Sequence, residues 1–335
     1  MTYAGPRSLR PRPHHPVLRR SADALQFGVG PGGSVEVSGG GPALRRLLLR
    51  WHGGQPVHEV VEHAIADGVE EPLVHSVLAQ LRAAGALVDA ADQDRVLAAR
   101  AAATVLVAGE GPLLAGVAST LAASGVGTLW VAASGTVVAD DVGTFTAADR
   151  GRPRGAAAVR AVHRVAPDVR CEARTPRGRA DLVVLTDQLH PEHHPVDLPH
   201  LLVRLADGLG LVGPLVLPGR TACLRCVDLH LAARDPCWPT VAADLVGRVG
   251  SASPAAMAAT AALATEQALA AVDAVVAAGP PPPTLDGVLE LDARRGTLRR
   301  QHWPPHPRCS CRAGHTCPVG FPTSTSSTAG QVTPG

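Results

Sequence analysis

The 335-residue sequence contains no Lys, no Asn and a single Ile, Ile65, and only 2% of its residues are aromatic. All 31 basic residues are therefore Arg, which is typical of the codon bias of a high-G+C genome. Without Lys, a P-loop lysine, Schiff-base chemistry and a lysine general base are excluded. Because aromatic residues are scarce, the hydrophobic 46% of the chain must form its cores from Ala, Val and Leu.

Strong charge of either sign is missing as well. The formal net charge is only +2 and the Arg residues are dispersed, so we expect no nucleic-acid partner. No charged-then-apolar signal segment opens the chain, which favours a cytoplasmic location, where cysteines more often bind metal than form disulfides. The longest apolar run, 254–279, contains Glu266, Gln267 and Asp273. It predicts a buried or interfacial helix instead of a membrane span.

Residues 1–90 form the first predicted domain. Three short apolar stretches separated by glycines predict strands, at 17–18, 25–29 and 35–37. Apolar residues at helical spacing then predict three helices, at 43–51, 57–66 and 70–84. With a last short strand at Leu87-Val88, these elements describe a winged-helix-like α+β module.

The charged residues 91–100 are expected to be a linker to a second domain, 101–318. There, strands alternating with helices predict a Rossmann-like parallel sheet covered on both faces. The expected strands are 104–108, 127–132 and 181–186, and the expected helices 112–124, 198–208 and 254–279. Residues 288–291 and 297–301 predict a hairpin. The tail, 319–335, is rich in Ser, Thr, Gly and Pro and is expected to be disordered.

Four cysteines give the strongest chemical signal, as two close pairs far apart in sequence: Cys223 with Cys226, and Cys309 with Cys311. Such pairs suit a tetrahedral four-sulfur Zn²⁺ site, which would be structural because it is closed to substrate. The fourth ligand is the least determined, since His306, His315 and Cys317 are also nearby. Free thiols or a disulfide are the alternative interpretations.

Other candidate ligands and nucleophiles have simpler interpretations. Cys171 and Cys237 each stand alone, and we expect both to be small buried apolar residues. A histidine group between two prolines is expected to be a solvent-facing loop, with a metal site as the alternative; it comprises His190, Glu192, His193 and His194.

A glycine loop follows the strand 104–108 and opens a helix, which is the context of a dinucleotide or ATP loop. Its glycines are Gly109, Gly111 and Gly116. Pro112 lacks an N–H that a phosphate would need, and Glu110 adds a like charge. No acid directly follows the second strand, where a ribose would be held. We therefore expect a vestigial loop and no bound ATP.

The order of these pieces resembles a known family. Residues 95–312 resemble the ThiF/MoeB-type, ubiquitin-activating-like superfamily, and more narrowly the leader-peptide-binding cyclodehydratase C proteins of thiazole/oxazole-modified peptide pathways. The residues that carry the resemblance are Pro199-His200-Leu201, the run from Gly213 to Arg220, Cys223 to Cys226, Asp228-Leu229-His230, Asp235 to Pro239, and Trp303 to Cys311. Residues 12–90 resemble the peptide-recognition element at the N-terminus of such proteins, by pattern more than by motif.

The resemblance implies a function without catalysis in this chain. Active superfamily members bind ATP and magnesium through an Asp after the second strand, an Asn-x-x-Arg-Gln segment and a Lys. This sequence lacks all three, and Arg150, Arg152 and Arg154 are poor replacements. The family then implies a scaffold that binds a precursor leader peptide, as a homodimer, and presents it to an ATP-using YcaO-type cyclodehydratase.

In that family the peptide adds a strand to an open sheet edge and packs on the third helix. By analogy the peptide-binding residues are expected to be Ser34, Val35 and Val37 on the edge, and Leu73, Val77 and Leu81 on the helix. The alternative is that these apolar residues are simply core. Two other functions compete: an active adenylyltransferase acting on a carrier-protein carboxylate, and a DNA-binding regulator, which the acidic third helix argues against.

Overall fold

The computed structural model describes residues 7–30, 34–51, 53–139, 141, 145–173, 179–187, 197–277 and 280–311. The chain divides into two compact units, Met1–Val96 and Leu97–Gly335. The histidine group at 190–194, the alternative ligands His315 and Cys317, and the tail lie outside the described residues.

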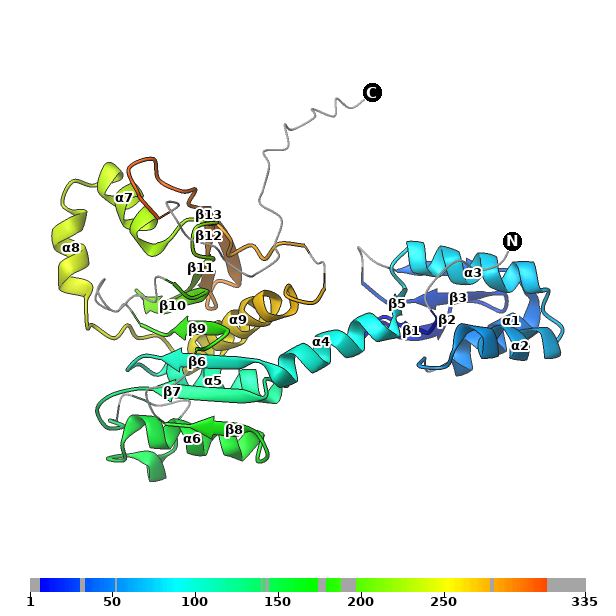
Figure 1. Cartoon of the computed structure of the whole chain (residues 1–335), viewed down its shortest axis with the longest axis horizontal. Coiled ribbons are helices and arrows are strands. Elements are labelled where there is room, and N and C mark those ends of the chain that lie inside the picture. Colours follow the sequence, from blue (N-terminus) through cyan, green and yellow to red (C-terminus); the bar gives the residue numbers. More distant parts are fainter. Residues whose placement is uncertain are drawn as a thin grey trace. The chain divides into compact units, whose positions relative to one another are not determined.

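Among its described residues, the first unit contains two small sheets and the helices α1, α2 and α3, before α4 begins (Figure 1). Strands β2, β3 and β4 form an antiparallel sheet in that order, and β1 pairs with β5. The strands are β1 (Leu9–Pro11), β2 (Val17–Arg19), β3 (Ala24–Phe27), β4 (Val35–Ser38) and β5 (Leu87–Asp89). The helices are α1 (Gly41–Arg50), α2 (Val57–Ala66) and α3 (Glu71–Ala83). The predicted elements are therefore present, and β1 is an addition.

Leu and Val form the core of this unit, as the scarcity of aromatics requires. Leu25 and Phe27 of β3 meet one buried stripe from each helix, including Leu44, Val60 and Leu78. Apolar residues at helical spacing place those side chains on a single face.

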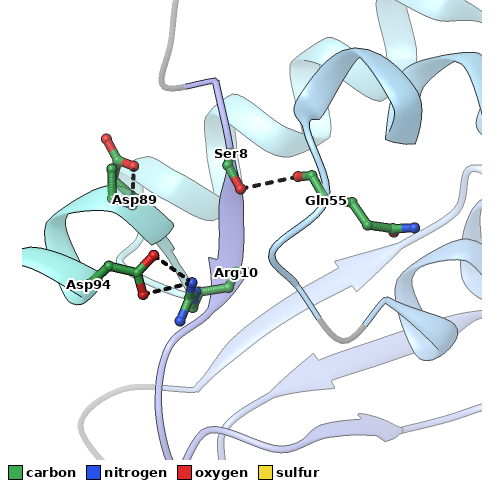
Figure 2. Close-up of polar contacts among 6 residues, drawn as sticks. Ser8, Arg10, Gln55, Asp89 and Asp94 are labelled. Atoms are coloured by element: carbon green, nitrogen blue, oxygen red, sulfur yellow. Dashed lines mark hydrogen bonds and ion pairs between the residues drawn. The ribbon is translucent and has the colours of Figure 1, made fainter. Parts of the chain in front are cut away.

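Residues 90–102, expected to include a linker, form the helix α4 (Ala90–Ala102) instead. Polar contacts fix its first turn to the first unit (Figure 2). Arg10 of β1 donates to Asp94 at 3.1 Å, and the Asp89 carboxylate caps the Ala91 N–H at 2.9 Å. Nearby, the Ser8 hydroxyl donates to the Gln55 carbonyl. The charged residues of this segment, which alternate with Ala and Leu, therefore form the solvent-facing side of α4 and not a linker.

The second unit contains an eight-stranded mixed sheet in the order β13-β12-β11-β10-β9-β6-β7-β8. Strands β10, β9, β6, β7 and β8 are parallel, while β11, β12 and β13 extend the sheet antiparallel from β10. The strands are β6 (Thr104–Ala108), β7 (Thr128–Ala132), β8 (Arg170–Glu172), β9 (Leu182–Leu185), β10 (His200–Ala206), β11 (Leu209–Val216), β12 (Gly287–Asp292) and β13 (Thr297–His302).

The helices α5 (Leu113–Ala123), α6 (Arg154–Val165) and α9 (Pro254–Asp273) pack together over one face of this sheet. The main hydrophobic core lies between these helices and the sheet. A smaller cluster on the other side of the strands includes Val183, Leu202 and Leu224. The remaining helices are the 3₁₀ turn η1 (Ala147–Asp149), α7 (Leu224–Arg234) and α8 (Trp238–Leu245). Helix α9 is long and apolar enough to cross a membrane by length and composition alone, yet most of it is buried in this core.

The helix predicted at 198–208 is wrong, because these residues form β10. A short apolar run such as Leu201-Leu202-Val203 does not distinguish a buried strand from a helix by its periodicity. The deciding signal is Asp207-Gly208, where both residues have positive φ, 53° and 79°. An Asp-Gly pair between apolar stretches is a strong hairpin signal, and here it joins β10 to the antiparallel β11.

Candidate functional site

The four predicted cysteine ligands come together in the structure. Cys223 and Cys226 lie at the start of α7, and Cys309 and Cys311 follow β13 and a proline-rich turn. Their Sγ atoms all lie within 4.8 Å of one another, and three of the separations are 3.8 Å (Cys223–Cys226), 3.7 Å (Cys223–Cys309) and 3.6 Å (Cys226–Cys311). A tetrahedral zinc with Zn–S bonds of about 2.3 Å has sulfur–sulfur edges of about 3.8 Å. The cluster therefore has the dimensions of a four-thiolate metal site.

The surroundings of the cluster favour the thiolate form of Cys226. The hydrogen bond with Cys223 and the backbone N–H of His306, which approaches the Cys226 Sγ at 3.3 Å, lower the pKa of Cys226. The pKa of Cys223 is raised by that same bond and by burial, since neighbouring thiols cannot all ionise without a cation. His306 contributes its backbone N–H, and its Nδ1 accepts from Arg308. It is therefore an outer partner of the cluster and not the fourth ligand.

Aromatic side chains support the segment that carries the second cysteine pair. Trp303 is buried, and the Arg234 guanidinium lies 4.5 Å from its ring centroid. The His230 ring of α7 packs on His306 and shares a 2.8 Å hydrogen bond with the Pro304 carbonyl. These contacts hold residues 303–306 against α7. They thereby keep Cys309 and Cys311, which follow this segment, close to Cys223 and Cys226 at the start of α7.

The two isolated cysteines differ from each other. Cys171 is buried in the main core, and burial together with Glu172 raises its pKa to about 11, so the thiol stays protonated. Cys237 is exposed at the start of α8, and the expectation that it is buried is wrong. Cys237 is the N-cap of α8, and Pro239 lies in the first turn of that helix, where proline is common.

The predicted glycine loop lies at the carboxyl end of β6, between β7 and β9. Gly109 follows the strand with φ of 153°, and a Cβ there would overlap the Thr186 hydroxyl. A Cβ on Gly111 would come within 2.6 Å of an Asp187 carboxylate oxygen. Gly116 lies inside α5, three residues after its start, and does not belong to the loop.

An acidic side chain that the sequence reasoning missed occupies the loop. The Asp187 carboxylate accepts the backbone N–H groups of Glu110 at 2.5 Å and Gly111 at 2.8 Å. Those are the donors that a phosphate would use at such a loop. Burial raises the pKa of Asp187 to about 6, against the opposing effect of the two N–H groups. The carboxylate is therefore ionised at neutral pH, and it occupies the position where the loop N–H groups would bind an anion.

The nearby cation is also already used. Arg154, at the start of α6, is buried and pairs with the buried Asp141 at 2.6 Å. It also donates to the Thr136 carbonyl at 3.0 Å. Arg152 donates to the Ala148 carbonyl and Arg150 is exposed, so neither is part of this group. The crevice at the carboxyl ends of the strands thus holds internally matched charges.

The signal for Asp187 was available in the sequence. An acid directly after a buried strand lies at the carboxyl edge of a parallel sheet, and β9 pairs with β6, which precedes the loop. The sequence alone does not give this neighbour relation, because β9 is far from β6 along the chain.

In the first unit, the predicted peptide-binding residues fall into two groups. Ser34, just before β4, is exposed, and Val35 and Val37 of β4 are half-buried against the unit's core. On α3, Leu73 is 36% exposed and Val77 is half-buried, but Leu81 is fully buried core.

Strand β4 is an edge of its sheet among the described strands. In the β3–β4 pairing, Leu25 lies opposite Val37, and the Gly39 N–H donates to the Asp23 carbonyl. Because hydrogen-bonded pairs alternate, the N–H groups of Glu36 and Ser38 point away from β3. They form an open hydrogen-bonding edge.

Comparison with known proteins shows the fold alone. No family model and no curated protein matches the sequence. Among solved structures, the chain is similar to Escherichia coli MccB with ATP, at 14% identity and a TM-score of 0.67, covering 91% of this chain and 99% of that one. The microcin C7 biosynthetic enzyme MccB in complex with N-formylated MccA gives 14% identity, a TM-score of 0.67, and 91% and 100% coverage. Selenomethionine PaaA has 14% sequence identity and a TM-score of 0.57, and the match covers 88% of this chain and 99% of that one. At this low identity the three neighbours show that the chain shares their fold.

Proposed function

We propose that this chain is a catalytically silent ThiF-like scaffold that binds a precursor leader peptide through its first unit. In this proposal a separate YcaO-type, ATP-dependent cyclodehydratase forms thiazole or oxazole rings in the presented peptide, in a bacteriocin-like pathway in the cytoplasm. A homodimer and a structural Zn²⁺ held by Cys223, Cys226, Cys309 and Cys311 are part of the same proposal.

The observation that carries the silent-scaffold proposal is the occupied glycine loop. Transfer of an adenylyl group needs unpaired donors and cations to balance triphosphate charge. Here Asp187 accepts the loop N–H groups, and the buried cation, Arg154, is matched by Asp141. A nucleotide would have to displace one carboxylate and compete with another.

The open edge of β4 supports the peptide-binding part. Strand addition takes its affinity from backbone hydrogen bonds and its selectivity from side-chain pockets. Glu36 and Ser38 offer the outward N–H groups, while Leu73 and Val77 are the accessible members of the predicted helix face. The similar MccB has been seen in complex with its partner MccA.

An active adenylyltransferase is the second candidate, and one observation favours it. A carboxylate at the carboxyl end of β9, beside a glycine loop, is also where a magnesium ion accompanying ATP would be held. MccB has been crystallised with ATP. The two candidates differ in the role of Asp187, because it blocks the nucleotide in the first and binds its metal ion in the second.

A substitution at Asp187 distinguishes the two functions, since it acts with opposite sign. If the carboxylate blocks the loop, Asp187→Asn weakens its hydrogen bonds to the loop N–H groups, and the affinity for ATP rises from an undetectable level. If the carboxylate holds Mg²⁺, wild-type protein binds ATP and Asp187→Asn loses that binding. Isothermal titration with ATP and MgCl₂ measures both proteins under the same conditions.

A further inference from the structure

Strand β13 is the outer edge of the large sheet, and all six of its residues, Thr297 to His302, are exposed. It pairs with β12 along its whole length. Within the second unit, no described strand pairs with its other side. An edge of this kind is a template for another strand.

The register shows which backbone groups are open. Glu290 lies opposite Arg299 and Asp292 opposite Thr297, and the Trp303 N–H donates to the Asp286 carbonyl in the same register. Since hydrogen-bonded and open pairs alternate, the residues opposite Asp292, Glu290 and Val288 bond to β12. The N–H and C=O groups of the intervening residues therefore point outward; these are Leu298, Arg300 and His302.

The edge is basic. After Asp292 the sequence contains no Asp or Glu, but it contains several Arg. On the hairpin, Arg295 pairs with Asp292, and Arg300 donates to the carbonyls of Pro283 and Leu285. Arg294 and Arg299 are exposed and have no ion pair among the described residues. Leu298, 54% exposed, adds an apolar anchor beside the open backbone.

Charge decides between the possible occupants. Only Leu298, Arg300 and His302 have open backbone groups, so a second copy pairing antiparallel about the middle of β13 would place either Arg300 opposite Arg300 or Arg299 opposite Arg299. Like charges directly opposite destabilise a sheet. The chain's own outlying segments, 1–6 and 312–335, contain no acid to match the arginines. We propose that β13 docks an extended, acidic segment of a different protein by strand addition, with alternating Asp or Glu side chains against Arg299 and Arg294. This inference goes beyond the proposed function and does not depend on it.

The test uses the full-length, zinc-loaded protein and fluorescence anisotropy. The probe is a labelled synthetic peptide of alternating Glu and Val flanked by Thr, and a peptide with Lys in place of Glu is its control. We expect saturable binding of the Glu peptide only, weakening as salt rises because the charges are exposed. Equal binding of the Lys peptide would overturn the proposal.

Two substitutions test the geometry. Leu298→Pro removes an outward N–H and leaves the β12 hydrogen bonds intact, while Leu298→Thr keeps that N–H and removes the same apolar side chain. We expect Leu298→Pro to weaken binding at least about tenfold relative to Leu298→Thr, since main-chain bonds supply the affinity in strand addition. Equal affinities of the two variants would overturn strand addition.

A charge reversal keeps the test valid if the proline variant fails to fold. Arg294→Glu lies in the exposed turn between β12 and β13 and faces no residue of the paired register. It should weaken binding of the Glu peptide and strengthen binding of the Lys peptide. A 20-base-pair DNA duplex that binds more tightly than the Glu peptide would show that the basic edge serves nucleic acid and would also contradict the proposal.

Discussion

The carboxylate of Asp187 lies 2.8 Å from the backbone nitrogen of Gly111 and accepts its hydrogen bond. The contact joins the carboxyl end of β9 to the loop after β6, the point of a parallel sheet where nucleotides bind. The protein's own anion thus takes the place of a phosphate. The proposed block of this loop differs from a simple loss of catalytic residues, because one substitution at Asp187 would remove the blocking carboxylate.

Asp187 should make stability depend on pH. Its pKa is raised from 3.8 to about 6, so the folded protein binds the proton more tightly than the unfolded chain. Stability is then greatest below pH 4 with respect to this group, and falls as the pH rises from about 4 to about 6. The loss is on the order of 1–3 kcal/mol, at about 1.4 kcal/mol for each unit. Urea unfolding between pH 4 and 7 should show this fall in wild-type protein and a smaller one in Asp187→Asn.

Removal of the metal should destabilise the second unit. A structural zinc contributes several kcal/mol of folding free energy, and about 1 kcal/mol changes the Tm of a domain of this size by about 2–4 °C. We expect Cys223→Ser or chelation to lower the Tm by roughly 10 °C, with zinc content measured by inductively coupled plasma spectrometry. Cys237→Ser is the matched control, since that thiol is exposed and outside the cluster. Full stability of a zinc-free protein would contradict the structural role.

The Arg154–Asp141 pair should be sensitive to loss of one member. Both side chains are buried, so Arg154→Ala leaves an uncompensated carboxylate, and removing one partner of a buried pair costs about 3–5 kcal/mol. Arg152→Ala, which removes an exposed side chain bonded to one carbonyl, should cost less than about 1 kcal/mol. Chemical denaturation measures both. Similar losses of unfolding free energy in the two variants would contradict the prediction that the buried ion pair is important for stability.

The open edge of β4 should be required for peptide binding. Peptides are selected on wild-type protein from a random display library and then measured on two variants. Glu36→Pro removes an outward N–H, whereas Glu36→Ala removes the side chain and keeps the N–H. We expect Glu36→Pro to weaken binding by about tenfold or more and Glu36→Ala to have little effect, because strand addition depends on the backbone. Peptides that bind both variants equally would place the site elsewhere.

Much of the fold follows from local pattern in the sequence. The strand Thr104–Ala108, the helix Leu113–Ala123 and the hairpin Gly287–His302 have strong signals and form close to their predicted bounds. The cysteine pairs were predicted from spacing, but the choice of Cys311 over His306 depended on geometry. The segment 198–208 was mispredicted because its apolar run fits both helix and strand.

The least predictable feature was the pairing of distant segments. Asp187 meets Gly111 only because β9 lies beside β6, and Asp141 meets Arg154 across the start of α6. Such neighbours are set by the order of strands in the sheet, which local periodicity does not encode. The contact between Asp187 and the glycine loop therefore does not follow from local sequence pattern.

Titration of ATP with magnesium into wild-type protein and Asp187→Asn, by calorimetry at pH 7.5, tests the central claim most directly. The silent-scaffold account predicts no saturable binding by the wild-type protein at sub-millimolar ATP, and measurable binding by Asp187→Asn. Tight binding by the wild-type protein that Asp187→Asn abolishes would contradict the account and make the chain an adenylyltransferase.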